Sequence, residues 1–326
     1  MSGAKALIES LKAEKVKHIF GIPGGAMIPV YDALYDEKKI RHILVRHEQA
    51  AAHAADGYAR VSGGPGVCMA TSGPGATNLT TGILNAYIDS SPVIAITGQV
   101  PKSLLGTDAF QEADVVSVML PITKHNFMMK SVSEVPRRVR LAFKIATTGR
   151  PGPVHIDLPK DVQVSEDKVE IPARVRYSKK IKTKPKAEEL RQVLKLLTRA
   201  DRPLIFAGGG IVSGNASAEL VRFAELLQAP VVTTPLGKGT IPENHPLALG
   251  MLGMHGRLVA NIAVTECDLI MGLGVRFDDR ATGDVQHFAP KAKKIHVDID
   301  PVELGKNVRV DLPIAADVKT TLKALI

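Results

Sequence analysis

Short, nearly continuous apolar runs alternate with amphipathic stretches along the first half of the chain. Strands are predicted at His18–Gly21, His42–Arg46, Val67–Thr71, Val93–Thr97 and Val154–Leu158. Helices are predicted at Gly3–Lys17, Ile28–Glu37, Gln49–Val61, Ala76–Asp89 and Pro136–Thr148. Apolar strands separated by helices are typical of a parallel sheet with helices on both faces. The sequence therefore predicts an α/β fold.

The alternation breaks between Asp161 and about Ala187, in a stretch with Pro172, Pro185 and many basic residues. It then resumes, with helices predicted at Ala187–Thr198, Ala216–Leu227, Leu258–Thr265 and Asp317–Ile326. Further strands are predicted at Pro203–Ala207, Val231–Thr233, Leu269–Gly272 and Lys294–Asp298. We therefore expect two doubly wound parallel-sheet domains, residues 1–165 and 188–326, joined by a basic linker at 166–187.

The formal net charge of +9 is concentrated in one segment. Seven of the thirteen residues from Arg174 to Lys186 are Lys or Arg, and subtracting them from +9 leaves +2 for the rest of the chain. A solvated linker explains this run better than a polyanion-binding patch, because its single aromatic residue, Tyr177, is too few for base stacking. No nucleic-acid partner is expected.

Other compositional features exclude several classes of protein. No apolar run reaches the roughly 18 residues of a membrane helix, so no membrane association is expected. Glu9, Lys12 and Glu14 interrupt the region where a secretion signal needs an apolar run. The two cysteines, Cys68 and Cys267, lie in separate apolar segments and provide no disulfide framework or zinc site. A reducing, cytoplasmic setting fits this pattern.

Three loops after predicted strands carry the residues most suited to chemistry in the first half. Gly24 and Gly25 follow the first strand, Glu48 follows the second, and the third leads into the sequence TSGPGATN at residues 71–78. In parallel sheets these loops share the edge where ligands bind. Each has a simpler explanation alone: a tight turn, a helix-dipole Glu, or an incomplete dinucleotide loop. A metalloprotease motif is excluded, because Ala51 stands where the second histidine is needed.

Two features of the second half moderately favour a nucleotide. Gly208–Gly210 follow the first strand there, where small residues permit close backbone approach to phosphates. Asp298 ends a later strand and could accept hydrogen bonds from a ribose.

Taken together, these segments resemble the catalytic subunits of the acetohydroxyacid (acetolactate) synthase family, within the thiamine-diphosphate-dependent enzymes. The resembling strings cover essentially the whole chain: FGIPGGAMIPVYDAL, RHEQAAAHAADGYAR, TSGPGATNL, TGQV, GTDAFQEADVV, GRPGPVHIDLPKDV, MLGMHG and GVRFDDRATG. The resemblance implies a pyrimidine-binding first domain and an FAD-binding central domain. It also implies decarboxylation of pyruvate and its joining to a second 2-ketoacid, pyruvate or 2-ketobutyrate, in valine, leucine and isoleucine biosynthesis.

The same resemblance assigns roles to residues of both domains. Glu48 becomes the carboxylate that activates thiamine diphosphate, and Arg280 becomes the cation that recognises the acceptor carboxylate. Gln111 and Gly25 are implied at the catalytic centre, and Ala26, Phe110, Lys160 and Met254 around the substrate. The implied FAD contacts are Arg150, Gly208, Gly209, Gly210, Thr234, Leu236, His255, Gly274, Arg276, Asp298, Ile299, Asp317 and Val318.

One family feature is missing from this sequence. The third domain of the family carries a G-D-G…N motif that binds Mg²⁺ and the cofactor diphosphate, whereas the only GD here is Gly283-Asp284, followed by Val285. We therefore expect no metal ligands in this chain and no synthase activity from it alone. A homodimer or higher homo-oligomer is expected, with a regulatory small subunit as a further candidate partner. Two alternatives stay open: another thiamine-diphosphate carboligase or oxidase, and a non-catalytic FAD-binding or assembly module.

Overall fold

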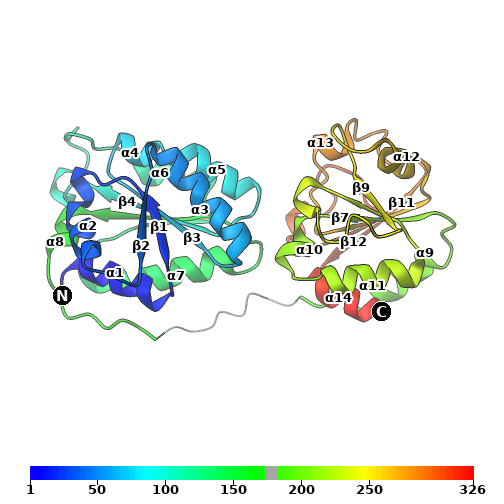
Figure 1. Cartoon of the computed structure of the whole chain (residues 1–326), viewed down its shortest axis with the longest axis horizontal. Helices are drawn as coiled ribbons and strands as arrows, with labels where there is room; N and C mark the ends of the chain where they lie inside the picture. The colour runs from blue at the N-terminus through cyan, green and yellow to red at the C-terminus, as the bar shows by residue number, and fades with distance from the viewer. Residues whose placement is uncertain (174–182) are drawn as a thin grey trace. The chain divides into compact units, whose positions relative to one another are not determined.

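The computed structural model describes residues 1–173 and 183–326 (Figure 1). The chain divides into two compact units, Met1–Lys179 and Lys180–Ile326, which are described separately below. The division falls inside the predicted linker at 166–187, and the central part of that linker, residues 174–182, lies outside the described residues.

Unit 1 is built on a six-stranded parallel sheet in the order β2-β1-β3-β4-β6-β5. Its strands are β1 (His18–Gly21), β2 (Arg41–Leu44), β3 (Gly66–Ala70), β4 (Val93–Gln99), β5 (His125–Met128) and β6 (Val154–Pro159). Its helices are α1 (Gly3–Ala13), α2 (Ile28–Tyr35), α3 (Glu48–Ser62), α4 (Pro74–Thr77), α5 (Thr80–Ile88), α6 (Val115–Met119), α7 (Val135–Thr147) and α8 (Lys160–Val164).

Helices cover both faces of this sheet (Figure 1). One buried cluster joins α1, α2 and α7 to the sheet, and a second lies under α3, α5 and α6. Every residue of β3, β4 and β6 is buried, as expected for strands with both faces covered. The central strands therefore place their carboxyl ends on one rigid edge.

Unit 2 repeats this architecture in the order β12-β11-β10-β7-β8-β9. Its strands are β7 (Pro203–Ala207), β8 (Val231–Thr233), β9 (Ala248–Met251), β10 (Leu269–Leu273), β11 (Lys293–Asp298) and β12 (Leu312–Ala315). Its helices are α9 (Ala187–Leu197), α10 (Gly209–Ser213), α11 (Ser217–Leu227), α12 (Leu258–Glu266), α13 (Asp279–Thr282) and α14 (Val318–Leu325). The predicted fold class, two doubly wound parallel sheets, is confirmed.

The structure corrects several predicted elements. The helix expected at Ala76–Asp89 is two helices, α4 and α5, with Asn78 and Leu79 between them. The helix expected to reach Lys17 ends at Ala13, because Lys15 takes a left-handed φ of 63°. The strands β5, β9 and β12 were not predicted. These strands are short, two of them contain Asn126 or Pro313, and β9 is joined to β8 through a register shift.

Candidate active site

The predicted site residues of unit 1 lie on loops at the carboxyl edge of its sheet. Gly25 follows β1, Glu48 follows β2, Gln111 lies in the connection after β4, and Lys160 follows β6. The strand order reverses direction between β1 and β3, because β2 lies on one side of β1 and all later strands on the other. Ligands of open α/β sheets bind at such a reversal.

Glu48 occupies the first turn of α3, at the positive end of the helix dipole. Its Oε2 accepts a hydrogen bond of 2.9 Å from Nδ2 of Asn78, and its side chain is half-buried. Within the described residues, Oε1 has no hydrogen-bond partner. The carboxylate is therefore held by one oxygen and can accept a hydrogen bond from a ligand through the other.

Small residues leave room beside this carboxylate. A Cβ added at Gly75 would lie 3.4 Å from Oε1 of Glu48, and it would also meet the side chain of Thr71. A Cβ at Gly25 would meet no atom within 4 Å, so the loop after β1 borders open space. The backbone N–H of Ala26 donates to Oγ1 of Thr71 at 3.1 Å, which ties the loops after β1 and β3 together.

The connection after β4 is organised by a single carboxylate. Glu112 accepts backbone N–H hydrogen bonds from Gly106, Thr107 and Ala109, and these bonds hold the pKa of its carboxyl below the ordinary value. The turn presents Phe110 to solvent with 88% of its surface exposed. Gln111 adopts a left-handed φ of 59°, and its carbonyl packs against Gly73, where a Cβ would approach within 2.6 Å.

The predicted residues of unit 2 also follow strands at one sheet edge. Gly208–Gly210 follow β7, Thr234 and Leu236 follow β8, Met254 and His255 follow β9, Gly274 and Arg276 follow β10, Ile299 follows β11 with Asp298 at its end, and Asp317 and Val318 follow β12. All neighbouring strands in this sheet are parallel, so these positions share the carboxyl edge. The sheet reverses between β7 and β10.

The glycines at this reversal lie where any larger residue would clash with neighbouring backbone. A Cβ at Gly208 would lie 2.2 Å from the carbonyl oxygen of Gly274, and a Cβ at Gly210 would lie 2.5 Å from Cα of Gly274. The N–H of Gly210 donates to that carbonyl at 3.0 Å. These glycines therefore let the backbones of the loops after β7 and β10 come into contact at the sheet reversal.

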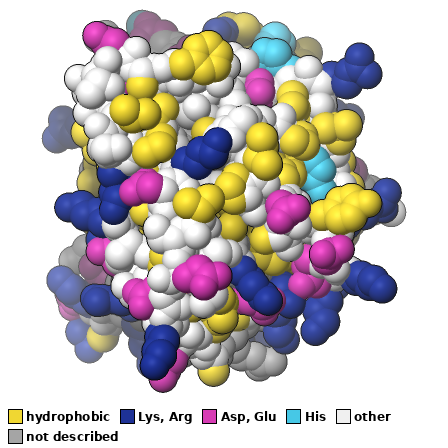
Figure 2. Space-filling model, turned by 90° about the vertical axis from the view of Figure 1, so that its left-hand side faces the viewer, with side chains coloured by type: hydrophobic (Ala, Val, Ile, Leu, Met, Phe, Trp, Pro, Cys, Tyr) yellow, Lys and Arg dark blue, Asp and Glu magenta, His cyan; other side chains and the backbone are white. Residues whose placement is uncertain are grey.

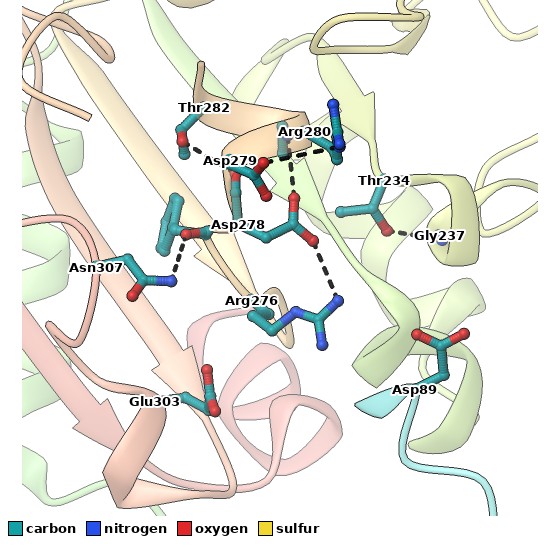
Figure 3. A network of polar contacts seen from close by, with 12 residues as sticks. Asp89, Thr234, Gly237, Arg276, Asp278, Asp279, Arg280, Thr282, Glu303 and Asn307 are labelled. Carbon is teal, nitrogen blue, oxygen red and sulfur yellow. Dashed lines mark hydrogen bonds and ion pairs between the residues drawn. The ribbon is translucent and has the colours of Figure 1, made fainter. Parts of the chain in front are cut away.

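Arginine and aspartate side chains gather after β10 (Figure 3). Nη2 of Arg276 donates to Oδ2 of Asp278 at 3.2 Å, and Asp278 also caps α13 through the N–H of Ala281. Arg280 lies 3.7 Å from Oδ2 of Asp279 in an exposed pair. The structure brings the predicted residues Arg280 and Met254 together, because the N–H of Met254 donates to the Arg280 carbonyl at 2.9 Å.

Three of the remaining predicted residues accept hydrogen bonds from residues two or three positions further along the chain. Thr234 accepts the N–H of Gly237 at 3.0 Å, Asp317 caps α14 through the N–H of Thr320 at 2.8 Å, and Asp298 accepts the N–H of Asp300 at 2.9 Å. Arg150 belongs to unit 1, where its Nε donates to Oγ of Ser90 at 2.7 Å.

Sequence reasoning missed Asn78 as a partner of Glu48. The only sequence signal for Asn78 was its place at the end of the TSGPGATN loop. Asn78 and Glu48 are 30 positions apart, and they meet only because β1 pairs with β3. Among the described residues no three His, Cys, Asp or Glu side chains lie close enough to hold a metal. No described helix has the length and apolarity to cross a membrane.

Two family models match the chain. The N-terminal TPP binding domain of thiamine pyrophosphate enzymes matches residues 1–118, and the central domain of the same enzymes matches residues 190–325. The chain carries the N-terminal and central domains of a thiamine pyrophosphate enzyme. Each domain model falls on one of the two parallel-sheet units.

Close relatives refine this assignment. The chain is 60% identical over its whole length to a probable acetolactate synthase large subunit of Methanocaldococcus jannaschii, covering 56% of that protein. It is 55% identical to the corresponding protein of Methanococcus aeolicus, covering 55%, and 52% identical to an acetolactate synthase of Mycobacterium bovis, covering 53%. The predicted resemblance is thus confirmed, and the chain spans about half the length of the curated relatives it matches.

Proposed function

We propose that this chain supplies the N-terminal and central parts of an acetolactate synthase. The reaction is decarboxylation of pyruvate and transfer of its two-carbon unit to a second 2-ketoacid, pyruvate or 2-ketobutyrate, in branched-chain amino acid biosynthesis. The single observation that carries the proposal is the carboxylate of Glu48, half-buried at the sheet reversal of a thiamine-diphosphate-binding domain with one oxygen free to accept a hydrogen bond.

The geometry around Glu48 suits the aminopyrimidine ring of thiamine diphosphate. When bound, this cofactor supplies the carbon nucleophile of the reaction. Glu48 would accept a hydrogen bond from the ring through Oε1 and stabilise the added proton there, while Asn78 holds Oε2. Gly75 and Gly25 leave the space that a flat ring needs, so the residues present fit the group.

For the substrate, we propose that the Arg280 guanidinium binds the acceptor carboxylate. A guanidinium forms paired hydrogen bonds with a carboxylate. The Arg280 guanidinium makes weak, exposed contacts with Oδ2 of Asp279 and Sδ of Met254, which a substrate carboxylate can replace. Phe110, Gln111, Lys160, Ala26 and Met254 are proposed to border the substrate, with Gln111 and Gly25 nearest the reacting atoms. Each of these residues lies on a carboxyl-edge loop of its own sheet.

We propose that unit 2 binds FAD along its carboxyl edge. The loops of Gly208–Gly210 and Gly274 approach each other closely, so backbone groups without side chains line the sheet reversal and would face the flavin nucleotide there. Asp298 lies at the end of β11, one strand further along the same edge. The reaction has no net change of redox state, so the flavin is proposed to be structural.

Association with other chains is also part of the proposal. Large apolar side chains of unit 1 are exposed, including Ile28, Tyr35 and Leu44 at 59, 90 and 63%. Acidic and basic side chains are interspersed around hydrophobic ones on the face in Figure 2, where no continuous basic surface is seen. These features favour self-association over polyanion binding.

Other partners and the compartment are also proposed. The Mg²⁺ and diphosphate site would come from further protein, and a regulatory subunit is a candidate partner. The two buried free thiols, Cys68 and Cys267, fit the reducing cytoplasm.

The test is a chimera in which this chain is followed by the remaining C-terminal part of the Methanocaldococcus jannaschii relative. With thiamine diphosphate, Mg²⁺, FAD and pyruvate, the chimera is expected to form acetolactate, whereas the 326-residue chain alone is expected to form none. Glu48→Gln in the chimera is expected to lower kcat by at least about 100-fold, because the amide cannot stabilise the ring proton.

Glu188→Gln is the matched control, since Glu188 also lies in the first turn of a helix, α9. It tests the helix-dipole effect, about 0.3–1 kcal/mol, without touching the site. Near-normal turnover by the Glu48→Gln chimera, or acetolactate formation by the isolated chain, would contradict the proposal. Comparison of pyruvate with 2-ketobutyrate as acceptor separates this activity from other carboligases.

A further inference from the structure

A buried chain of polar side chains runs through unit 1 beneath the carboxyl edge. Thr97, Gln99, His155 and Asp157 have no exposed surface and lie on adjacent positions of β4 and β6. The Thr97 hydroxyl lies 2.7 Å from Nε2 of His155 and 2.6 Å from Oδ1 of Asp157. No step of the proposed reaction uses these groups.

The position of each hydrogen in this buried polar network can be deduced from Thr123, which Asn126 connects to His155. The Thr123 hydroxyl lies 2.8 Å from the carbonyl oxygen of Met119, which can only accept, so Thr123 donates. The Thr123 oxygen must then accept its other hydrogen bond, so the Asn126 atom facing it is the amide nitrogen, Nδ2, at 3.0 Å. The Asn126 carbonyl therefore faces Nδ1 of His155 at 3.1 Å, and Nδ1 must carry a hydrogen.

The remaining protons are then fixed if His155 is neutral. Complete burial lowers the pKa of His155 to about 3, so the ring carries one hydrogen, on Nδ1, and Nε2 is an acceptor. The single hydrogen of the Thr97 hydroxyl therefore points to Nε2. Its 2.6 Å contact with Asp157 needs a second hydrogen, which only the Asp157 carboxyl can supply.

We propose that Asp157 is a neutral carboxylic acid that donates its proton to Thr97 and anchors the stem of the loop carrying Phe110 and Gln111. Its other oxygen, Oδ2, accepts from Nε2 of Gln99 at 3.1 Å. The second hydrogen of that amide goes to the carbonyl of Ala113 at 2.9 Å, two residues beyond Gln111. Asp157 is thus a positioning residue that acts through Gln99.

Few charged or titratable groups surround Asp157. On β6 the neighbour is His155, while β4 presents only the uncharged Thr97 and Gln99. Asp114, the N-cap of α6, contributes a like charge, and the Cys68 thiol of β3 lies in the apolar cluster on the same side. Burial first and then Asp114 raise the pKa of Asp157 to about 7, which agrees with the proton count.

The first experiment is infrared difference spectroscopy of the 326-residue chain at about pH 6, below the pKa of Asp157. A protonated-carboxyl C=O band is expected in the unmodified chain and in the control Asp284→Asn, because Asp284 is exposed and ionised beside His287. The band should vanish in Asp157→Asn, whose amide reproduces both hydrogen bonds. Absence of the band from the unmodified chain would place the proton on His155 and overturn the assignment.

The second experiment is hydrogen exchange of residues 106–113. Asp157→Asn should leave exchange unchanged. Gln99→Met removes the hydrogen bonds that Gln99 donates to Ala113 and Asp157 and the one it accepts from the N–H of Val100, and it should speed exchange about fivefold to tenfold while keeping the acid band. Unchanged exchange in Gln99→Met would overturn the anchoring role. The statement that this positions Gln111 for catalysis rests on the proposed function, but neither readout needs activity, so the two can fail separately.

Discussion

Asp157 of β6 has no exposed surface, and its carboxyl contacts Thr97 and Gln99 of β4, so pH acts on it through the folding equilibrium. Its pKa is raised from 3.8 to about 7, mainly by burial. Between these values the unfolded chain releases a proton that the folded chain keeps, so the free energy of unfolding must fall as the pH rises.

We therefore predict that the contribution of Asp157 to the stability of unit 1 is lost between about pH 4 and pH 7 and changes little above that range. At about 1.4 kcal/mol per pKa unit, the Asp157 contribution is at most on the order of 4 kcal/mol. Urea unfolding of the unmodified chain and Asp157→Asn at several pH values measures it, since subtraction removes the His155 contribution common to both. A pH-independent difference between the two proteins would contradict a raised pKa.

At the scale of elements, the loops after β7 and β10 set the shape of the unit 2 edge. Gly274 has a left-handed φ of 58°, and a Cβ there would lie 2.6 Å from Cα of Gly210. Backbone meets backbone at this point, so no side-chain rotation relieves the contact.

Gly274→Ala is therefore predicted to destabilise unit 2 by about 2–5 kcal/mol, from backbone strain and overpacking together. The matched control is Gly305→Ala, where φ is 72° but no atom lies within 4 Å of the added Cβ, so only about 1 kcal/mol is expected. Chemical unfolding measures both, and FAD titration should show weaker binding only for Gly274→Ala. Equal losses of stability would show that the loop contact is unimportant.

The position of a strand within its sheet determines whether the sequence predicts it. The strands β3, β4 and β6 were predicted because both of their faces are buried and most of their residues are apolar. The strands β5, β9 and β12 are sheet edges, and they contain Asn126, Gly250 and Pro313, which are uncommon inside strands. An edge strand has one neighbour, so its pattern is weak, and its existence follows from the sheet beside it.

At the scale of the whole molecule, each unit has its own hydrophobic core. The two clusters of unit 1 draw on residues between Ala4 and Val169, and the two clusters of unit 2 draw on residues between Val193 and Ile326. Separate cores of this size are typical of domains that fold alone.

We predict that residues 1–173 and 183–326, produced separately, each fold cooperatively. Circular dichroism should show one sharp thermal transition for each piece, and FAD titration should detect binding by the second piece alone, as the proposed function requires. A piece without a cooperative transition would show that its core depends on the other unit.

The sequence by itself determined the two parallel sheets and the loops that carry the candidate site. Apolar strands alternating with helices can only bury their surface in this arrangement, and parallel strands bring their carboxyl ends to one edge whatever the details of packing. The sequence therefore predicts the loops with Gly25, Glu48 and Gly208 at the carboxyl ends of strands, where the structure has them.

The tertiary structure alone decided how individual groups are paired. The hydrogen bond from Asn78 to Glu48, the approach of Gly208 and Gly210 to Gly274, and the proton between Asp157 and Thr97 join residues 30 to 66 positions apart. Such pairings depend on strand register and on tenths of an ångström in packing. No local pattern records them, because their energies arise only when distant segments meet in a space from which water is excluded.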